Sequence, residues 1–259
     1  SSKIKELIIL LSLDILNELS ALPARESRIV GGTVTNIQTW PYSAAVLIGG
    51  TLAFRQACGS SILNNRSALS AAHCFTSQAV SSYRIRVGST YSNAGGTVFT
   101  TQHFVNHPNY VHATGDNDIT VLRVNGIFTF NENVQPGRIA GTTYNLGDNQ
   151  AVWAIGWGAI RYRGPSSPNL RQVQIWTVNQ DICRSRYLGL GRSITDNMLC
   201  SGWLDRGGRD SCVGDSGGPL IHHNTIVGVI SFGFECAHHY YPGVYARVSR
   251  FTNWITSLA

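Results

Sequence analysis

Charged residues are scarce in this 259-residue chain: they make up 13% of it, about half the roughly 25% of an average soluble domain. No stretch reaches the roughly 18 unbroken apolar residues of a membrane span, which excludes a multi-span membrane protein. A hydrophobic content of 43% excludes a disordered chain. There is one methionine against 27 glycines, and Ser, Thr and Asn are frequent, so we expect short strands and tight turns rather than an all-helical protein.

Lysine is missing beyond residue 28. Residues 1–28 have four basic and four acidic side chains, whereas residues 29–259 have 16 arginines and 10 acidic residues, which accounts for the formal net charge of +6. The arginines form no stripe or cluster, so they indicate ordinary surface charge rather than a nucleic-acid site. Because arginine stays charged above pH ~12 and lysine titrates near ~10.4, the bias predicts activity well above neutral pH, with a lineage bias in composition as the alternative.

The cysteines contain no Cys-x-x-Cys pair, which argues against a zinc ribbon or a thioredoxin-like site. An even number in a chain rich in glycine and poor in lysine favours disulfides, and therefore an oxidising compartment, but leaves their pairing open. A glycosylation triplet at Asn65 agrees weakly with this. The six residues are Cys58, Cys74, Cys183, Cys200, Cys212 and Cys236.

The first 28 residues look separate from the rest of the chain. Two lysines precede the apolar run Leu7–Leu13, and small residues follow near Ser20–Ala24, as in a signal peptide. An amphipathic helix in a pro-segment is the alternative, since three polar residues interrupt the pattern: Asp14, Asn17 and Glu18. In both interpretations this stretch lies outside the main fold.

From Ile29 onward the signals are those of strands. Residues Tyr83–Val87 alternate between apolar and polar, as a half-buried strand does. Short apolar runs bounded by turn residues indicate further strands at Ala68–Ala72, Ala151–Ile155 and Ile226–Ser231. The turn-rich stretch Asn131–Asn149 is the natural junction between two β halves.

Helical spacing appears only at the C-terminus, where apolar residues recur three or four positions apart: Val248, Phe251, Trp254, Ile255 and Leu258. Two histidine pairs, His222-His223 and His238-His239, have no nearby cysteine or carboxylate at ligand spacing. We therefore interpret all four as surface histidines and expect no metal site.

Three motifs carry chemistry. Gly214-Asp215-Ser216-Gly217-Gly218-Pro219 places a serine in a turn whose flanking glycines leave amide hydrogens free to point inward. His73 stands beside Cys74, and Asp118 begins the apolar stretch Ile119–Leu122. Taken singly, each motif could be structural: a glycine-rich turn, a core histidine and a turn aspartate.

Together, in the order His, Asp, Ser, these motifs resemble the chymotrypsin-fold serine endopeptidases, and the trypsin branch in particular, from Ile29 to the C-terminus. The resemblance implies an all-β fold of two six-stranded antiparallel β-barrels with a C-terminal helix. It divides the chain into residues 1–28 as a signal or pro-segment, 29–140 and 141–246 as the two barrels, and 247–259 as the helix.

The resemblance also implies the catalytic roles. Ser216 would attack the scissile carbonyl, His73 would take its proton and later deliver it to the leaving amine, and Asp118 would hold and stabilise the imidazole ring. The backbone N–H groups of Gly214 and Ser216 would form the oxyanion hole.

Substrate preference follows from the same comparison. Asp210 matches the acid at the base of the trypsin pocket, and Ser231, Gly233 and Gly243 match its walls, so protein and peptide substrates should be cut after Arg or Lys. Three residues depart from vertebrate trypsins, so the sequence does not settle the shape of the pocket rim and the neighbouring subsites. Phe232 stands where those enzymes have a tryptophan, and Phe234 and Glu235 replace a smaller Ser-Gly pair.

Arg28-Ile29-Val30-Gly31-Gly32 matches the activation site of trypsin zymogens. Cleavage after Arg28 would free the Ile29 amine to pair with Asp215, which makes the chain as given an inactive precursor, with slow self-activation as one route. The resemblance pairs the cysteines as Cys58–Cys74, Cys183–Cys200 and Cys212–Cys236.

The segment Ser89–Thr100 lacks the carboxylates with which vertebrate trypsins bind calcium, so we expect no calcium there, and no cofactor. The resemblance further implies a secreted, extracellular monomer that protein protease inhibitors block. Three stretches look like moth-type insect trypsins, with the silk-softening cocoonases as one candidate group: Ile62–Cys74, Thr177–Tyr187 and Ile194–Cys212. The alternatives are a trypsin-fold binding protein without useful turnover and a processing protease of a defence cascade.

Overall fold

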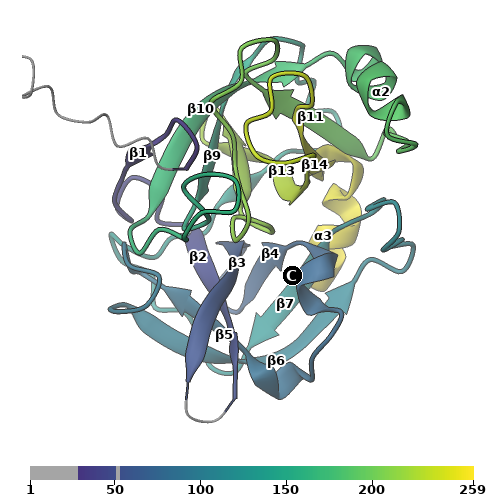
Figure 1. Ribbon diagram of the computed structural model, residues 1–259. Helices are drawn as coiled ribbons and strands as arrows, with labels where there is room; N and C mark the ends of the chain where they lie inside the picture. The colour runs from purple at the N-terminus through teal and green to yellow at the C-terminus, as the bar shows by residue number, and fades with distance from the viewer. Residues whose placement is uncertain (1–28, 51–52) are drawn as a thin grey trace, which may run out of the picture.

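Two closed barrels of six antiparallel strands, one above the other in Figure 1, form the protein. The coordinates are a computed structural model that describes residues 29–50 and 53–259. The two-barrel fold expected from the resemblance is confirmed. The signal or pro-segment prediction for residues 1–28, and with it Arg28, lies outside the described residues.

The first barrel closes in the order β2-β3-β4-β7-β6-β5. Its strand β5 is the predicted Tyr83–Val87, with Tyr83, Ile85 and Val87 buried and the two arginines between them only partly covered, so the alternation of the sequence is the alternation of the barrel wall. The strands are β2 (Ser43–Gly49), β3 (Phe54–Ile62), β4 (Ser67–Ser70), β5 (Tyr83–Val87), β6 (Thr97–Asn106) and β7 (Thr120–Val124).

The second barrel runs β10-β11-β14-β13-β12-β9 and closes through the pairing of β9 with β10. Buried runs predicted at Ala151–Ile155 and Ile226–Ser231 form β9 and β13. The strands are β9 (Ala151–Gly156), β10 (Arg171–Val178), β11 (Met198–Gly202), β12 (Pro219–His222), β13 (Thr225–Phe232) and β14 (Gly243–Arg247).

Two short strands cross between the predicted halves. Both β1 (Thr33–Val34) and β8 (Arg138–Ile139) lie within residues 29–140, yet β1 pairs with β10 and β8 pairs with β13 of the second barrel. The described chain therefore begins against the second barrel before it enters the first one.

Helix α2 (Gln180–Leu188) was not expected, because we assigned helical spacing to the C-terminus alone. Only Cys183 and Tyr187, one turn apart, are buried, so the apolar stripe is too narrow to stand out in the sequence. The start of the helix is fixed locally, since the Asn179 side chain accepts hydrogen bonds from the N–H groups of Asp181 and Ile182 at 3.0 and 3.1 Å.

The predicted C-terminal helix is present as α3 (Thr252–Leu258), after the 3₁₀ turn η3 (Val248–Arg250). It braces the first barrel: the rings of Phe251 and Trp254 meet His107, at the end of β6, with centroids 5.2 and 4.9 Å apart. Thr252 Oγ1 donates to the carbonyl of Ala140 at 2.7 Å.

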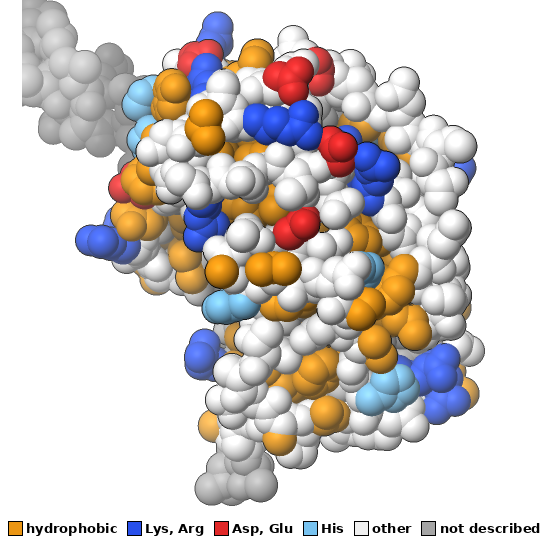
Figure 2. Space-filling model, turned by 90° about the vertical axis from the view of Figure 1, so that its right-hand side faces the viewer, with side chains coloured by type: hydrophobic (Ala, Val, Ile, Leu, Met, Phe, Trp, Pro, Cys, Tyr) orange, Lys and Arg blue, Asp and Glu red, His pale blue; other side chains and the backbone are white. Residues whose placement is uncertain are grey.

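The largest core cluster spans both barrels. It joins Leu47 and Val121 of the first barrel to Val152 and Leu220 of the second. No helix in the described part of the chain is long and apolar enough to cross a membrane. The basic side chains on the face drawn in Figure 2 are dispersed in small groups, in keeping with the absence of a basic stripe in the sequence.

Candidate active site

His73 and Asp118 meet on the first barrel. His73 lies in the 3₁₀ turn η1 (Ala72–Phe75) that follows β4, and Asp118 lies just before β7, which pairs with β4. The Asp118 carboxylate accepts from His73 Nδ1 at 2.7 Å and from the His73 backbone N–H at 2.9 Å. Because a carboxylate can only accept, Nδ1 carries a proton and Nε2 is left with its lone pair.

Asp118 has a third donor, from the second barrel. Ser231, on β13, donates its hydroxyl to Asp118 Oδ2 at 2.5 Å, and Asp118 is only 2% exposed. Three hydrogen bonds to a buried carboxylate fix its position and, through it, the orientation of the His73 ring.

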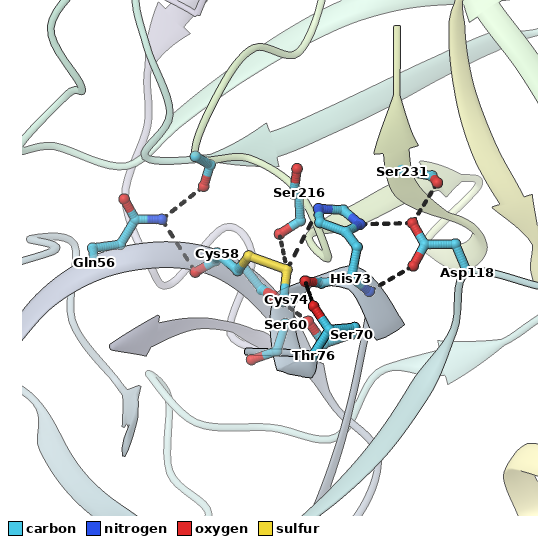
Figure 3. The surroundings of a disulfide bond; sticks show 12 residues. Gln56, Cys58, Ser60, Ser70, His73, Cys74, Thr76, Asp118, Ser216 and Ser231 are labelled. Atoms are coloured by element: carbon cyan, nitrogen blue, oxygen red, sulfur yellow. Dashed lines mark hydrogen bonds and ion pairs between the residues drawn. A yellow bond between two sulfur atoms is a disulfide. The ribbon is translucent and has the colours of Figure 1, made fainter. Parts of the chain in front are cut away.

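Ser216 comes to the same place from the second barrel. Figure 3 shows it on the side of His73 away from Asp118, next to the Cys58–Cys74 disulfide. Its carbonyl accepts from Gly59 N–H of β3 at 2.8 Å, which ties the serine turn to the first barrel. Cys74 Sγ lies 3.8 Å from both His73 Nε2 and the Ser216 carbonyl oxygen. No hydrogen bond joins the Ser216 hydroxyl to Nε2 in the described structure; such bonds commonly form only when substrate is bound.

The glycines of the serine turn do what their sequence positions suggest. Gly214 and Gly217 have φ of +95° and +81°, and a Cβ on Gly217 would lie 2.2 Å from the Ser70 hydroxyl. Among the hydrogen bonds of residues 29–50 and 53–259, none uses the backbone N–H of Gly214 or Ser216. Two amides that have no hydrogen-bond partner among the described residues are able to bind an oxyanion.

Asp215 faces away from Ser216 into the protein. It is fully buried, and its carboxylate accepts from Gly158 N–H at 2.7 Å and Cys212 N–H at 2.9 Å. Burial raises the pKa of this carboxyl to about 6, against the lowering effect of the two N–H donors.

Ile29, the first described residue, is fully buried in the core cluster that spans both barrels. The carbonyl of the next residue, Val30, accepts from Asp210 N–H at 3.1 Å, so the start of the described chain lies against the segment that leads to Asp215.

A pocket of about 220 Å³ opens beside Ser216. All four residues that we assigned to the substrate pocket line it: Asp210, Ser231, Gly233 and Gly243. The Cys212–Cys236 disulfide forms part of its wall. The other two disulfides are Cys58–Cys74 and Cys183–Cys200, so the structure holds the three pairs expected from the resemblance.

Asp210 is 5% exposed and accepts from the N–H groups of Ser211 at 2.8 Å and Ala237 at 3.0 Å. Burial raises the pKa of its carboxyl to about 7, while the two N–H donors lower it. A buried carboxylate without a cation beside it favours a positively charged guest.

Of the three departures from vertebrate trypsins, Phe232 and Glu235 line the pocket and Phe234 does not. The Phe234 ring instead packs on Tyr241 and His238, with centroids 4.8 and 5.7 Å away. Phe234 therefore takes up none of the pocket that Asp210 lines.

Sequence reasoning missed several supporting residues because they lie far from the motifs. Gln56 donates to the carbonyls of Gly214 at 2.7 Å and Cys58 at 3.1 Å, which holds the oxyanion turn from the first barrel. Gly156 and Gly158 leave room for Asp215, since a Cβ on either would lie within 2.5 Å of its carboxylate. A lone Gln or a Gly-Trp-Gly triplet carries no local signal for such a contact.

One histidine interpretation was wrong. His222 is buried rather than on the surface, because its ring packs under Tyr144, whose hydroxyl lies 2.8 Å from Nδ1. Burial lowers the pKa of this histidine, and the neighbouring His223 adds to the effect.

Metal-ligating side chains gather at one point of the described chain, in the group Cys58, His73 and Cys74. Both cysteines are in a disulfide there, so neither sulfur is a thiolate that could bind a metal. In the segment where vertebrate trypsins bind calcium, protein groups fill the loop: Ser89 Oγ donates to the Ala94 carbonyl at 2.6 Å, and the Arg86 guanidinium donates to the Gly95 carbonyl.

Comparison with known proteins agrees with this geometry. The trypsin family model matches residues 29–255. Alkaline trypsin A of Manduca sexta is 59% identical over 239 residues, which cover 91% of this chain and 93% of the relative. Trypsin CFT-1 of Choristoneura fumiferana is 57% identical over 245 residues, covering 94% and 96%, and achelase-1 of Lonomia achelous is 52% identical over 235 residues, covering 89% and 100%.

Proposed function

We propose a function from one premise: the chain belongs to the trypsin family and is a trypsin-like serine endopeptidase. On that premise it is the precursor of a secreted enzyme, activated by cleavage after Arg28, that hydrolyses protein and peptide bonds after Arg or Lys. The observation that carries the proposal is a pocket lined by both Ser216 and the buried Asp210, with His73 next to Ser216.

The mechanism uses three side chains. Asp118 keeps the proton of His73 on Nδ1, so Nε2 can accept the proton of the Ser216 hydroxyl as that oxygen attacks the scissile carbonyl. The free N–H groups of Gly214 and Ser216 would stabilise the oxyanion of the tetrahedral intermediate, where losing one donor costs ~2.7–4 kcal/mol. The imidazolium then protonates the leaving amine, and a water molecule attacks the acyl-enzyme by the same route.

Selection of the residue before the cleaved bond rests on charge. An arginine or lysine side chain that enters the pocket pairs with Asp210, whereas a neutral side chain leaves that carboxyl buried and unpaired. Asp210 is 5% exposed, so solvent does not compete strongly with a bound cation for its carboxylate.

Activation would supply a cation to Asp215. Its carboxyl is fully buried and, among the described residues, accepts only from backbone N–H groups. Cleavage after Arg28 creates an ammonium group on Ile29, a residue that is itself buried in the same core. Pairing of the two would hold the serine turn and the Asp210 pocket in the conformation that binds substrate.

The secreted state rests on the three disulfides, which persist in oxidising compartments. We infer a digestive or other extracellular protein-degrading role from the similarity to the trypsins of Manduca sexta and Choristoneura fumiferana. Activity in an alkaline medium is supported by the similarity to an alkaline trypsin and by the arginine bias of this chain.

The test compares Ser216→Ala with Ser257→Ala, a control that removes an exposed hydroxyl from α3. Both proteins are cleaved after Arg28 and assayed on an arginine amide and with a fluorophosphonate that labels active serines. Ser216→Ala should lose the label and fall by about 10⁶-fold in kcat, while the control keeps both. Near-normal turnover by Ser216→Ala would contradict the mechanism, and absence of turnover by the cleaved wild-type protein would favour a binding protein.

A further inference from the structure

A second pocket, of about 260 Å³, lies on the other side of His73 from the Asp210 pocket. Its lining combines His73 and Asp118 with Tyr110, His112, Gly115 and Arg192. Two residues of β13, Ser231 and Phe232, line both pockets and form the wall between them.

A substrate chain that lies along β13 would place side chains in both pockets. Its side chains alternate between two faces, so the first residue before the scissile bond enters the Asp210 pocket and the second and fourth residues face the other pocket. Ser231 bonds to Asp118, beside His73, whereas Phe232 is one residue farther along β13. The second substrate residue before the scissile bond therefore lies by His73. The fourth substrate residue lies two residues farther along the strand, about 7 Å from the second at ~3.3–3.4 Å per residue.

Arg192 lies at the Phe232 end of this second pocket. Its guanidinium stands 4.8 Å from the centroid of the Phe232 ring. The Phe232 ring packs closely on the backbone of Gly115, since a Cβ added at Gly115 would lie 2.8 Å from two atoms of the ring. Phe232 stands where vertebrate trypsins have tryptophan, and with Arg192 it forms a flat apolar surface edged by a cation.

Among residues 29–50 and 53–259, no carboxylate forms an ion pair with this cation. The one carboxylate in the lining of this pocket, Asp118, is 2% exposed and already accepts three hydrogen bonds. The open part of the pocket therefore presents positive charge.

We propose that Arg192 makes this subsite select an acidic side chain at the fourth residue before the scissile bond. The inference rests on the proposed function, since it requires cleavage after a basic residue held in the Asp210 pocket. It bears on activation as well: the fourth residue before the bond after Arg28 is Arg25, which would bring a like charge to Arg192. The mature enzyme should therefore be a poor activator of its own precursor.

The first experiment measures kcat/KM on fluorogenic amides Xaa-Ala-Ser-Arg with Glu, Gln or Lys as Xaa. The wild-type enzyme should cleave the Glu peptide about two- to fivefold faster than the Gln peptide, as expected for an exposed ion pair, and the Lys peptide more slowly than either. The Glu-to-Gln ratio should fall toward 1 in about 0.5 M salt. It should be 1 in Arg192→Gln, and Arg192→Glu should prefer Lys over Glu.

The matched control is Arg206→Gln, which removes a cation that lies against Trp203, outside both pockets. It should keep the wild-type ratio. Equal cleavage of the Glu and Gln peptides by the wild-type enzyme, or a ratio that Arg192→Gln leaves unchanged, would overturn the inference. Failure of the proposed function would look different, because the Gln peptide would then not be cleaved at all.

The second experiment uses the precursor as substrate. Precursor carrying Ser216→Ala cannot cleave itself, so its cleavage after Arg28 by added mature enzyme can be timed on a gel. Arg25→Glu in that precursor should speed cleavage by wild-type enzyme but not by Arg192→Gln. Equal rates for Arg25 and Glu at this position would count against the subsite.

Discussion

The buried carboxyl of Asp210 makes binding of a cation in the pocket depend on pH. In the empty pocket burial raises the pKa of this group from 3.8 to about 7, a difference equivalent to about 4 kcal/mol. Benzamidine, a small amidinium, should bind the ionised form, since it pairs with the carboxylate. Its dissociation constant should be nearly constant above pH 7 and rise about tenfold per pH unit below it. Between pH 8 and pH 5 the expected change is about 100-fold, or about 2.7 kcal/mol.

The same raised pKa also determines whether the free energy of unfolding rises or falls with pH. A carboxyl whose folded-state pKa exceeds its unfolded value contributes stability at low pH that is lost as pH rises through about 7. The empty enzyme should therefore lose stability from pH 5 to pH 8 at this site, and benzamidine should restore more of it at pH 8.

Calorimetric titration of the mature enzyme with benzamidine, from pH 5 to pH 8, measures this directly. Two variants isolate the group: Glu235→Gln removes the other carboxyl that lines the pocket and should keep the slope, while Asp210→Asn should bind weakly at every pH. Near pH 7, titrations in buffers of different ionisation enthalpy should detect release of about half a proton. A dissociation constant that is flat down to pH 5 would show that the N–H donors from Ser211 and Ala237 offset the cost of burial, and would refute the reasoning.

Three further predictions concern the pocket, the triad and alkaline activity. Gly243→Ala places a methyl group 3.0 Å from Asp210 Oδ1 and should lower kcat/KM on an arginine amide by about 10- to 200-fold. Gly233→Ala, whose nearest contact would be 3.5 Å away, should lower kcat/KM less. A larger loss in Gly233→Ala than in Gly243→Ala would contradict the geometry. Asp118→Asn should lower kcat by about 10⁴-fold with little change in KM, and a loss under tenfold would show that this carboxylate does not orient the histidine. The activity of the cleaved enzyme should stay high at pH 9 and fall only as the Ile29 amine deprotonates. Pairing with Asp215 raises the pKa of that amine above its usual ~8, so the stabilisation from the pair is lost as pH rises through the raised value. An activity optimum below pH 7 would leave the arginine bias without a functional meaning.

Local sequence patterns were sufficient to predict features that depend on a single strand or turn. Tyr83–Val87 alternates in sequence and in burial because one face of β5 is the barrel core. Gly214 and Gly217 adopt the positive φ that only a glycine-flanked serine turn allows cheaply. The site could be assembled only through the family resemblance, since nothing local says that His73 and Ser216, on different barrels, lie together.

What the sequence could not supply depends on contacts between distant segments. Strand β1 joins the second barrel because it pairs with Arg171 and Gln172 of β10, outside the part of β10 that pairs with β11, and nothing in the local sequence of β1 predicts this pairing. His222 is buried because Tyr144, far away in the chain, covers it. Arg192 becomes a candidate specificity determinant only because the structure places it against Phe232 in the lining of the second pocket. The sequence alone does not predict that contact.

The core cluster that spans both barrels has a consequence for how the protein unfolds. The cluster takes Leu47 and Val121 from one barrel and Val152 and Leu220 from the other, so separating the barrels would expose apolar surface of both. Helix α3 adds to the coupling, because it belongs to the second half of the chain and packs on His107 of the first. The two barrels are thus halves of one cooperative unit: calorimetry should show a single transition, and neither half expressed alone should fold.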